Sequence, residues 1–271
     1  MMRYKMKKYV FFFLLLILTS CKKDEISSPS NNDENKFYPT TLYKLSQPES
    51  DSLQVKFSQK ILGTNYLAKL DSFGLLDHYG VLSRGKSNIS DPAEAISLAK
   101  TALLHLNEFS NVSDTSTLYV KEAINYHPSP PNFTDWVIIF KNQSYNGLEV
   151  WETEILTIVA NDLILLDGHY YKNVFIPKQN IISNEHAKKN LIGKEIHYVC
   201  WTPGTYTIAD SSINVEAIEQ CIYPLIKTNC IELRVVWKIP ISFAPGDPPM
   251  WYYFMDVLTG EIVAVQELFI C

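Results

Sequence analysis

The sequence predicts an α+β protein made of two tandem lobes, each with one helix packed on a small antiparallel sheet. The first observation is a helical segment at residues 91–109 that is followed by several strand-like runs. The second is that this order, helix then strands, recurs from residue 183 onward, at a spacing of about 90 residues. The third is the presence of turn residues between the runs, as in Asn146-Gly147 and Thr259-Gly260. One helix over one face of each sheet is an economical way to bury both apolar surfaces.

The N-terminal residues 1–20 have the parts of a bacterial lipoprotein signal peptide. Four cations stand at its start: Arg3, Lys5, Lys7 and Lys8. The apolar run that follows, residues 9–18, is shorter than the ~20 residues that a membrane-spanning helix needs. Leu18-Thr19-Ser20-Cys21 resembles the lipobox read by lipoprotein signal peptidase, so we expect Cys21 to carry the lipid. A short transmembrane anchor and an ordinary secretory signal are the alternatives, but a small residue directly before a cysteine suits neither.

A lipid on Cys21 would place the chain in the outer membrane of a Gram-negative bacterium, either facing the periplasm or exposed at the surface. Residues 21–36 are rich in Ser, Asn, Asp and Glu, which predicts a disordered tether. Lys22-Lys23-Asp24-Glu25 resembles the charged tag of lipoproteins that are flipped to the cell surface. An ordinary linker gives the same pattern, so the leaflet stays open.

Composition limits the classes of partner. The formal net charge is −5, and the sequence has no segment rich in Lys and Arg. Binding to nucleic acid is therefore not expected. Aromatic residues make up 13% of the chain, and 16 of them are Tyr, a composition that suits strands and binding faces.

Residues 37–90 are expected to form an N-terminal extension. Within it, residues 53–57 alternate between apolar and polar, which predicts a half-buried strand. Residues 65–79 show no clear periodicity, and their structure stays open.

The first lobe is expected at residues 91–180. Asp91 can cap a helix in which Pro92 needs no N–H and Glu94 complements the helix dipole. An apolar stripe follows at helical spacing: Ala95, Leu98, Ala99, Ala102, Leu103 and Leu106. Strand-like runs come next, at residues 118–126, 136–141, 149–159 and 163–171.

The second lobe is expected at residues 181–271. Ser183 can cap a helix that runs to Gly193, with Ala187 and Leu191 facing inward. Strand-like runs follow at residues 195–201, 232–242, 251–256 and 261–269.

Several of these runs carry a family resemblance. Residues 136–141 followed by 143–150 resemble the fungalysin/thermolysin-type propeptide motif, although Glu149 stands where that family usually has Pro. Residues 183–193, 233–239 and 251–263 resemble a PepSY domain. The last stretch is the most specific, with an aromatic strand, Asp256, two residues, Thr-Gly-Glu and an apolar strand.

The resemblance implies a propeptide-like body. In such proteases the propeptide precedes a zinc catalytic domain, which it inhibits and helps to fold. This sequence contains no His-Glu-x-x-His motif, so we expect propeptide-like lobes without the protease domain.

Four cysteines besides Cys21 lie in the last third of the chain: Cys200, Cys221, Cys230 and Cys271. An even number in an exported chain favours two disulfides. We expect Cys221 to pair with Cys230 and Cys200 with Cys271, although the other two pairings remain open. A zinc site is not expected, because His197 and Cys200 have no second pair of ligands at matching spacing.

No set of residues forms a catalytic constellation, so we expect no enzyme, metal or cofactor. Asp256 is expected to order its turn through side-chain hydrogen bonds. Glu152 and Glu154 are expected on one solvated strand face.

The aromatic strand is the candidate binding surface, and its residues are Trp251, Tyr252, Tyr253 and Phe254. Alternation along a strand would bury one pair and leave the other free to grip a peptide or a sugar ring, unless both pairs are covered. The sequence therefore predicts a non-enzymatic, lipid-anchored envelope protein that binds protein or peptide, in the role of an inhibitor or chaperone of a secreted metalloprotease. A glycan- or nutrient-binding surface lipoprotein is the alternative.

Overall fold

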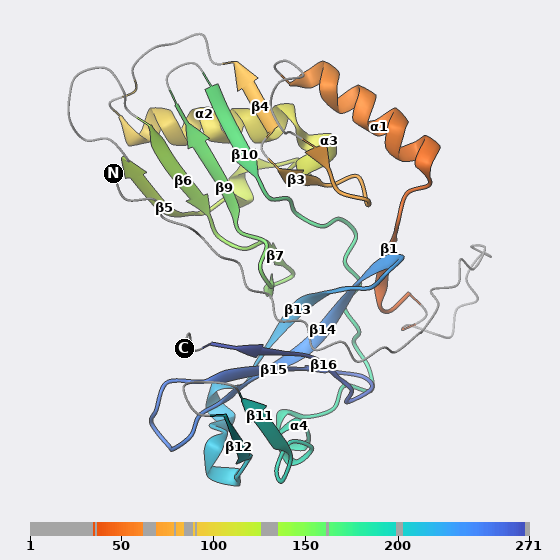
Figure 1. Cartoon of the computed structure of the whole chain (residues 1–271), viewed down its shortest axis with the longest axis vertical. Coiled ribbons are helices and arrows are strands. Elements are labelled where there is room, and N and C mark those ends of the chain that lie inside the picture. The colour runs from red at the N-terminus through yellow and green to blue at the C-terminus, as the bar shows by residue number, and fades with distance from the viewer. Residues whose placement is uncertain are drawn as a thin grey trace.

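The chain folds as an α+β protein with several mostly antiparallel sheets (Figure 1). The computed structural model describes residues 35, 37–61, 69–78, 80–83, 89, 91–125, 135–160, 163–198 and 203–268. The predicted signal peptide, Cys21 and nearly all of the predicted tether lie outside these residues.

The first sheet has five strands in the order β4-β10-β9-β6-β5, and all its pairings are antiparallel. Its strands are β4 (Gly80–Ser83), β5 (Val120–Asn125), β6 (Trp136–Phe140), β9 (Ile155–Val159) and β10 (Leu163–Asp167). The helices beside it are α1 (Gln47–Lys60), α2 (Pro92–His105) and α3 (Asn107–Ser110).

The second sheet has seven strands in the order β16-β15-β14-β13-β8-β7, and β1 also pairs with β14. Its strands are β1 (Thr40–Tyr43), β7 (Ser144–Tyr145), β8 (Leu148–Val150), β13 (Glu219–Ile226), β14 (Cys230–Ile241), β15 (Trp251–Asp256) and β16 (Ile262–Glu267). Along one edge of the long strand β14, residues 230–233 pair with β1 and residues 236–241 with β15. The other edge pairs with β13, which is parallel to β8.

The remaining elements are short. They are the hairpins β2 (Lys69–Leu70) with β3 (Leu76–His78) and β11 (Glu195–Tyr198) with β12 (Gly204–Thr207), the helix α4 (Asn184–Lys189), and three 3-10 turns at Thr115–Thr117, Asp210–Ser212 and Val215–Ala217.

Helix α2 covers one face of the five-stranded sheet. It begins as the sequence predicts, because the Asp91 carboxylate accepts a hydrogen bond from the Ala93 amide at 2.9 Å and Pro92 occupies the first turn. Ala95, Ala99 and Leu103 are fully buried in the core that α2 shares with the sheet. The helix ends at His105, and α3 continues the segment after Leu106.

Helix α4 covers part of one face of the seven-stranded sheet. The Ser183 hydroxyl accepts a hydrogen bond from the His186 amide at 3.2 Å, which confirms the predicted N-cap. Ala187 and Leu191 are fully buried against a core that includes Trp251. The helix ends at Lys189 and is therefore shorter than predicted, since the sequence indicated an end at Gly193.

Two predictions about local structure are wrong. Residues 53–57 lie inside helix α1, where the Ser46 amide donates to Glu49 at 2.8 Å and so completes a capping box. The predicted strand 149–159 is broken at Trp151 and Glu152, where Glu152 has a φ of 55° in a turn between β8 and β9. Glu152 and Glu154 therefore do not share a strand face.

The two halves of the chain have related element orders but different sheets. In each, a helix precedes a four-strand meander, which is β5-β6-β9-β10 in the first half and β13-β14-β15-β16 in the second. The hairpin β7–β8 lies between β6 and β9 in sequence but joins the seven-stranded sheet. The sheets do not divide cleanly at residue 180.

Candidate functional site

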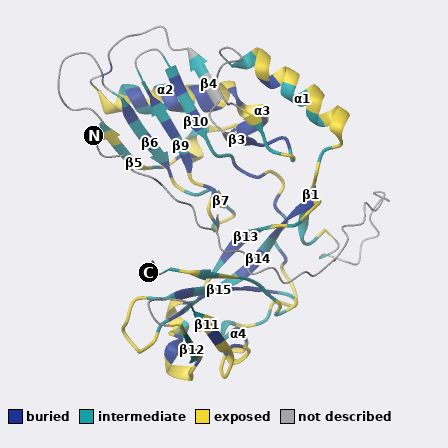
Figure 2. Cartoon of the chain, in the orientation of Figure 1, coloured by how far each residue is buried: buried dark blue, intermediate teal, exposed yellow. Residues whose placement is uncertain are grey.

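The five-stranded sheet has an aliphatic face that no described helix or strand covers. Alternation along the strands places one set of side chains against α2, and the register pairs Val137 with Ile158, and Ile139 with Leu156, on the opposite side. We call this side the outer face and define it by seven residues: Ile124, Val137, Ile139, Leu156, Ile158, Leu163 and Leu165. All seven are partly exposed, and Ile124 is 40% exposed. Figure 2 shows partly exposed residues alternating with buried ones along these strands.

The sequences of these strands are those of a sheet covered on both sides. Central strands β6, β9 and β10 read WVIIF, ILTIV and LILLD, with hardly a polar residue among them. An antiparallel sheet with one solvated face normally alternates apolar with polar residues, whereas a near-continuous apolar run is typical of strands buried on both faces. The described residues supply a covering layer on one face only, where α2 packs together with Phe57 of α1 and Phe109 of α3. The outer face therefore has the character of a contact surface.

The charges beside the outer face are of mixed sign. Lys121 and Glu154 form an ion pair at one end of the sheet. Glu122 lies opposite Ile139 and Asp167 lies opposite Leu156, and neither acid has an ion-pair partner among the described residues. Lys141 follows β6 directly. An apolar centre with a charged border is the composition of a protein-binding surface.

The aromatic strand β15 does not form the exposed platform that we considered. Trp251 and Phe254 are fully buried and Tyr253 is 6% exposed, so only Tyr252 reaches solvent in part. Trp251 and Tyr253 lie in the core under α4, and Phe254 is covered from the other side by Trp151. The structure is therefore close to the alternative in which all four aromatic side chains are covered, because three of the four are buried.

Tyr252 takes part in a cation–aromatic cluster within the chain. The Lys238 ammonium lies 4.4 Å from the centroid of the Trp151 ring and 4.5 Å from that of Tyr252. It also donates to Glu219 at 2.8 Å. The rings that a sugar would stack on are thus already engaged by the chain's own lysine.

Asp256 orders its turn as predicted, and it also anchors a buried charge network. Its Oδ1 accepts hydrogen bonds from the amides of Leu258 and Thr259, both at 2.9 Å. Its Oδ2 accepts from the Tyr38 hydroxyl at 2.9 Å and from Arg234 at 3.1 Å. Because Tyr38 precedes β1, this network fixes the start of the described chain to the seven-stranded sheet.

Further ion pairs extend the network along β14. Arg234 donates to Glu232 at 2.8 Å, and Lys227 donates to the same carboxylate at 2.6 Å. Burial acts to raise the pKa of Glu232, but the hydrogen bonds from Lys227 and Arg234 hold it below its usual value. Burial and the adjacent Asp256 raise the pKa of the Tyr38 hydroxyl well above its ordinary value. The tyrosine is therefore a neutral donor at physiological pH, and the network is structural.

The cysteines differ from the predicted pairing. Cys221 carries a free, buried thiol, whereas Cys230 is disulfide-bonded. The register explains why they do not pair, since Cys221 lies opposite Val236, six residues along β14 from Cys230. That separation exceeds the ~7 Å limit between the Cα atoms of a disulfide. Cys200 and Cys271 lie outside the described residues.

Cys221 is expected to resist alkylation in the native protein. Burial raises its pKa to about 12, and only the thiolate is nucleophilic, so almost none of the thiol is reactive at pH 8. Peptide mapping after iodoacetamide treatment should find Cys221 unmodified before unfolding and modified after it. Native labelling at the rate of free glutathione would contradict this assignment, and Cys221→Ala provides the blank.

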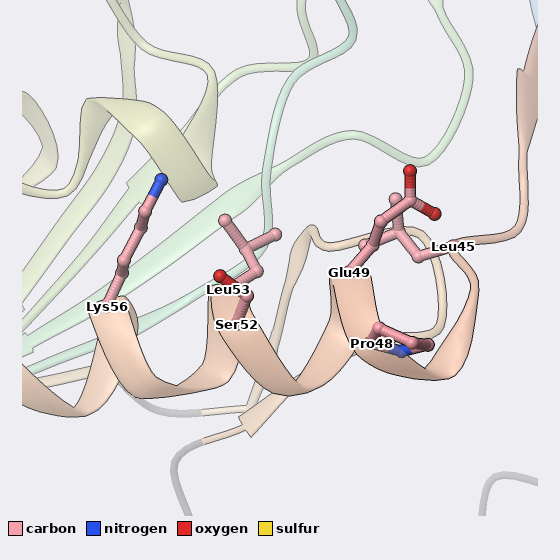
Figure 3. A pocket seen from close by; sticks show the side chains of 6 residues that line it. All are labelled: Leu45, Pro48, Glu49, Ser52, Leu53 and Lys56. Carbon is pink, nitrogen blue, oxygen red and sulfur yellow. The ribbon is translucent and has the colours of Figure 1, made fainter.

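Two hollows of the described surface are shallow. One of about 380 Å³ lies beside α1 and is lined by Leu45, Pro48, Glu49, Ser52, Leu53 and Lys56 (Figure 3). The one carboxylate that lines this hollow belongs to Glu49, which already accepts a hydrogen bond from the Ser46 amide in the cap of α1. A second, of about 430 Å³, lies between β1 and residues 173–175 and has no titratable lining residue except Tyr145. Neither gathers the convergent polar groups of a small-molecule site.

The described residues contain no group of three or more His, Cys, Asp or Glu side chains that could hold a metal ion. No helix among them has the length and apolar character to cross a membrane.

Comparison with known proteins gives structural likeness alone. No family model matches the chain, and no curated protein was found to match it. Among solved structures, the C-terminal domain of YpeB from Bacillus megaterium is similar at a TM-score of 0.30 and 15% sequence identity, and the likeness covers 83% of this chain and 99% of that domain. A TM-score this low carries no argument about the function of this chain.

Proposed function

We propose that this chain is a non-enzymatic, lipid-anchored protein of the cell envelope that binds another protein through the outer face. The observation that carries the proposal is the uncovered aliphatic surface of β6, β9 and β10. A lipid on Cys21 holds that surface at the membrane and raises its effective concentration for proteins that pass by.

The propeptide and PepSY resemblance suggests which protein is bound. A helix followed by a four-strand meander occurs twice, and the Asp256 turn has the hydrogen bonds expected of its Asp-x-x-Thr-Gly-Glu motif. These features support two tandem PepSY-like lobes. By analogy with such propeptides, the partner is a secreted metalloprotease that the chain restrains or helps to fold.

The glycan-binding alternative has no observation in its favour. Its candidate surface is the strand in which Trp251, Tyr253 and Phe254 are buried. Tyr252 and Trp151 are held by Lys238, so they form no free flat platform.

Site-specific photo-crosslinking in cells tests whether the outer face binds protein. A photoreactive side chain at Ile158 is expected to give an adduct of one discrete mass. The same group at Val55, which is 56% exposed on α1, is the matched control and is expected to give none. Equal adducts from both positions, or none from Ile158, would show that the outer face is not a docking surface.

Inhibition of thermolysin tests the identity of the partner class. We expect the full chain, purified in detergent, to inhibit the enzyme. The double variant Val137→Lys/Ile158→Lys should raise the inhibition constant at least about tenfold, because two charges then replace buried apolar contacts. The Val55→Lys variant should leave it unchanged. If crosslinking succeeds while inhibition is absent, the protein-binding proposal stands and inhibition of a thermolysin-type metalloprotease is ruled out as its role.

A further inference from the structure

Strand β16 forms one end of the seven-stranded sheet, and its outer edge has unused backbone hydrogen-bonding groups. The Leu268 amide donates to the Met250 carbonyl at 2.9 Å, so Leu268 faces β15. In an antiparallel pair, bonded and non-bonded positions alternate along the strand. The N–H and C=O groups of Glu267 and Val265 therefore point away from β15, and neither residue has a hydrogen-bond partner for them among the described residues.

This edge lacks the usual protection against strand addition. Edge strands are commonly guarded by charged residues or bulges. At the edge of the five-stranded sheet, β5 carries Lys121 and Glu122 next to a register shift. In β16 the register shift falls at Val263, and the regularly paired residues that follow it, Ala264, Val265 and Gln266, are uncharged. Val265 is 47% exposed.

Charge decides which strand the edge can accept. Glu261 and Glu267 flank the uncharged centre, and both are exposed. Glu152, also exposed, adds a third acid through its hydrogen bond with Gln266 at 3.2 Å. Two cations lie on β14: Arg234 is 3.5 Å from Glu261 but is shared with the more buried Glu232 and Asp256, and Lys238 is paired with Glu219.

In the register centred on Ala264, a second copy of the chain is a poor occupant. Antiparallel self-pairing about Ala264 would place Glu261 of one copy opposite Glu267 of the other, twice. Like charges directly opposite each other destabilise a strand pair, whereas opposite charges stabilise it. The complementary occupant is a foreign strand with a cation at each end of an uncharged centre.

We propose that β16 binds an extended peptide segment with basic residues at both ends, which pairs antiparallel as an additional strand of the seven-stranded sheet. Backbone hydrogen bonds to Val265 and Glu267 hold the segment, and its end cations lie opposite Glu261 and Glu267. This site is separate from the outer face and does not depend on the function proposed for it.

The first test compares two fluorescent seven-residue peptides by anisotropy with the full chain in detergent. One reads Lys-Thr-Val-Thr-Val-Thr-Lys, and the other has Glu in place of both Lys. We expect the Lys peptide to bind at least about tenfold more tightly, because two attractive pairs replace two repulsive ones. Equal affinities, or no binding of the Lys peptide at about 1 mM, would overturn the proposal.

The second test asks whether binding is strand addition. With the first Lys opposite Glu267, the third peptide residue lies opposite Val265 and exchanges hydrogen bonds with it. N-methylation of the third residue should abolish binding, whereas N-methylation of the fourth, whose N–H points away, should preserve it. Equal effects of the two modifications would overturn strand addition even though the peptide binds.

The protein side offers a matched pair of variants. Val265→Pro removes an outward N–H that no ladder bond uses, so an edge strand can tolerate it. It should abolish binding of the Lys peptide, whereas Ile158→Lys on the outer face should not affect it. Retained binding by Val265→Pro with an unchanged unfolding midpoint would contradict the proposal, and the N-methyl peptides decide the matter if that variant does not fold.

Discussion

Replacement of Asp256 by alanine is expected to lower the free energy of unfolding by roughly 3–5 kcal/mol, because it removes the fully buried carboxylate from the network and leaves Arg234 with Glu232 and the more exposed Glu261. The Asp256 side chain is fully buried, and that of Arg234 is 13% exposed. The same substitution removes the acceptor for the amides of Leu258 and Thr259 and for the Tyr38 hydroxyl. Urea denaturation followed by tryptophan fluorescence measures the change.

Two further substitutions separate the parts of this effect. Asp256→Asn keeps an oxygen for the turn amides but loses the charge, so it should cost less than Asp256→Ala. Glu261→Gln removes the exposed partner of Arg234, which lies 3.5 Å away with a side chain that is 52% exposed, and should cost only about 0–1 kcal/mol. A loss below about 1 kcal/mol for Asp256→Ala would show that the network does not stabilise the sheet.

The turn at Asp256 could be predicted from sequence, whereas the network around it could not. Asp followed by Thr-Gly has a local meaning, because the carboxylate reaches amides two and three residues away. Tyr38 lies 218 residues from Asp256 in the sequence, and no local sequence pattern predicts a contact over that separation. The same holds for Trp151, which reaches Phe254 only because the β7–β8 hairpin leaves the first sheet.

Strand β13 was missed for a local reason. It contains Pro224, and proline argues against a central strand because it cannot donate to the ladder. The structure accommodates it because β8 pairs with β13 only at Cys221 and Ile222, which leaves Pro224 beside an unpaired stretch. At Pro224, β13 has a paired neighbour on one side only, so proline is tolerated there as it is in an edge strand.

The outer face was only half predictable. Apolar runs at residues 136–141 and 163–171 correctly indicated strands, which the structure places at β6 and β10. Because both faces of these strands are aliphatic, the pattern could not tell which face α2 would cover. The excess of apolar residues was itself the signal of a second contact layer, and we assigned the binding surface instead to the aromatic residues of β15.

Helix α1 shows how a short pattern misleads. Residues 53–57, Leu-Gln-Val-Lys-Phe, alternate as a strand would, but five residues fit both periods. The better signal lay upstream, where Ser46, Pro48 and Glu49 form the start of a helix. Within the helix Phe57 is the one fully buried side chain, so the attachment of α1 depends on it.

Phe57→Ala is therefore expected to release α1 from the five-stranded sheet. The Phe57 ring lies 4.9 Å from that of Phe109, and both belong to the core under α2. Truncation of a buried phenylalanine costs about 3–5 kcal/mol. The other attachments are weaker: the ion pairs of Lys56 and Lys60 with Glu108 at 3.8 and 3.6 Å are worth less than about 1 kcal/mol each, Gln54 accepts a hydrogen bond from the Leu70 amide at 3.3 Å, and Leu53 is only partly buried. An isolated helix of 14 residues is marginal in water, so a released α1 should unfold.

Hydrogen exchange distinguishes this local release from global loss of stability. In Phe57→Ala, the amides of residues 47–60 should lose protection while those of β6 and β9 keep most of theirs. The control is Val55→Ala, which lies two residues away on the exposed side and should change stability by no more than about 0.5 kcal/mol. Uniform loss of protection across α1, β6 and β9 would instead mean that α1 is part of the cooperative core, in which case the capping box at Ser46 and the packing of Phe57 stabilise the sheet that carries the outer face.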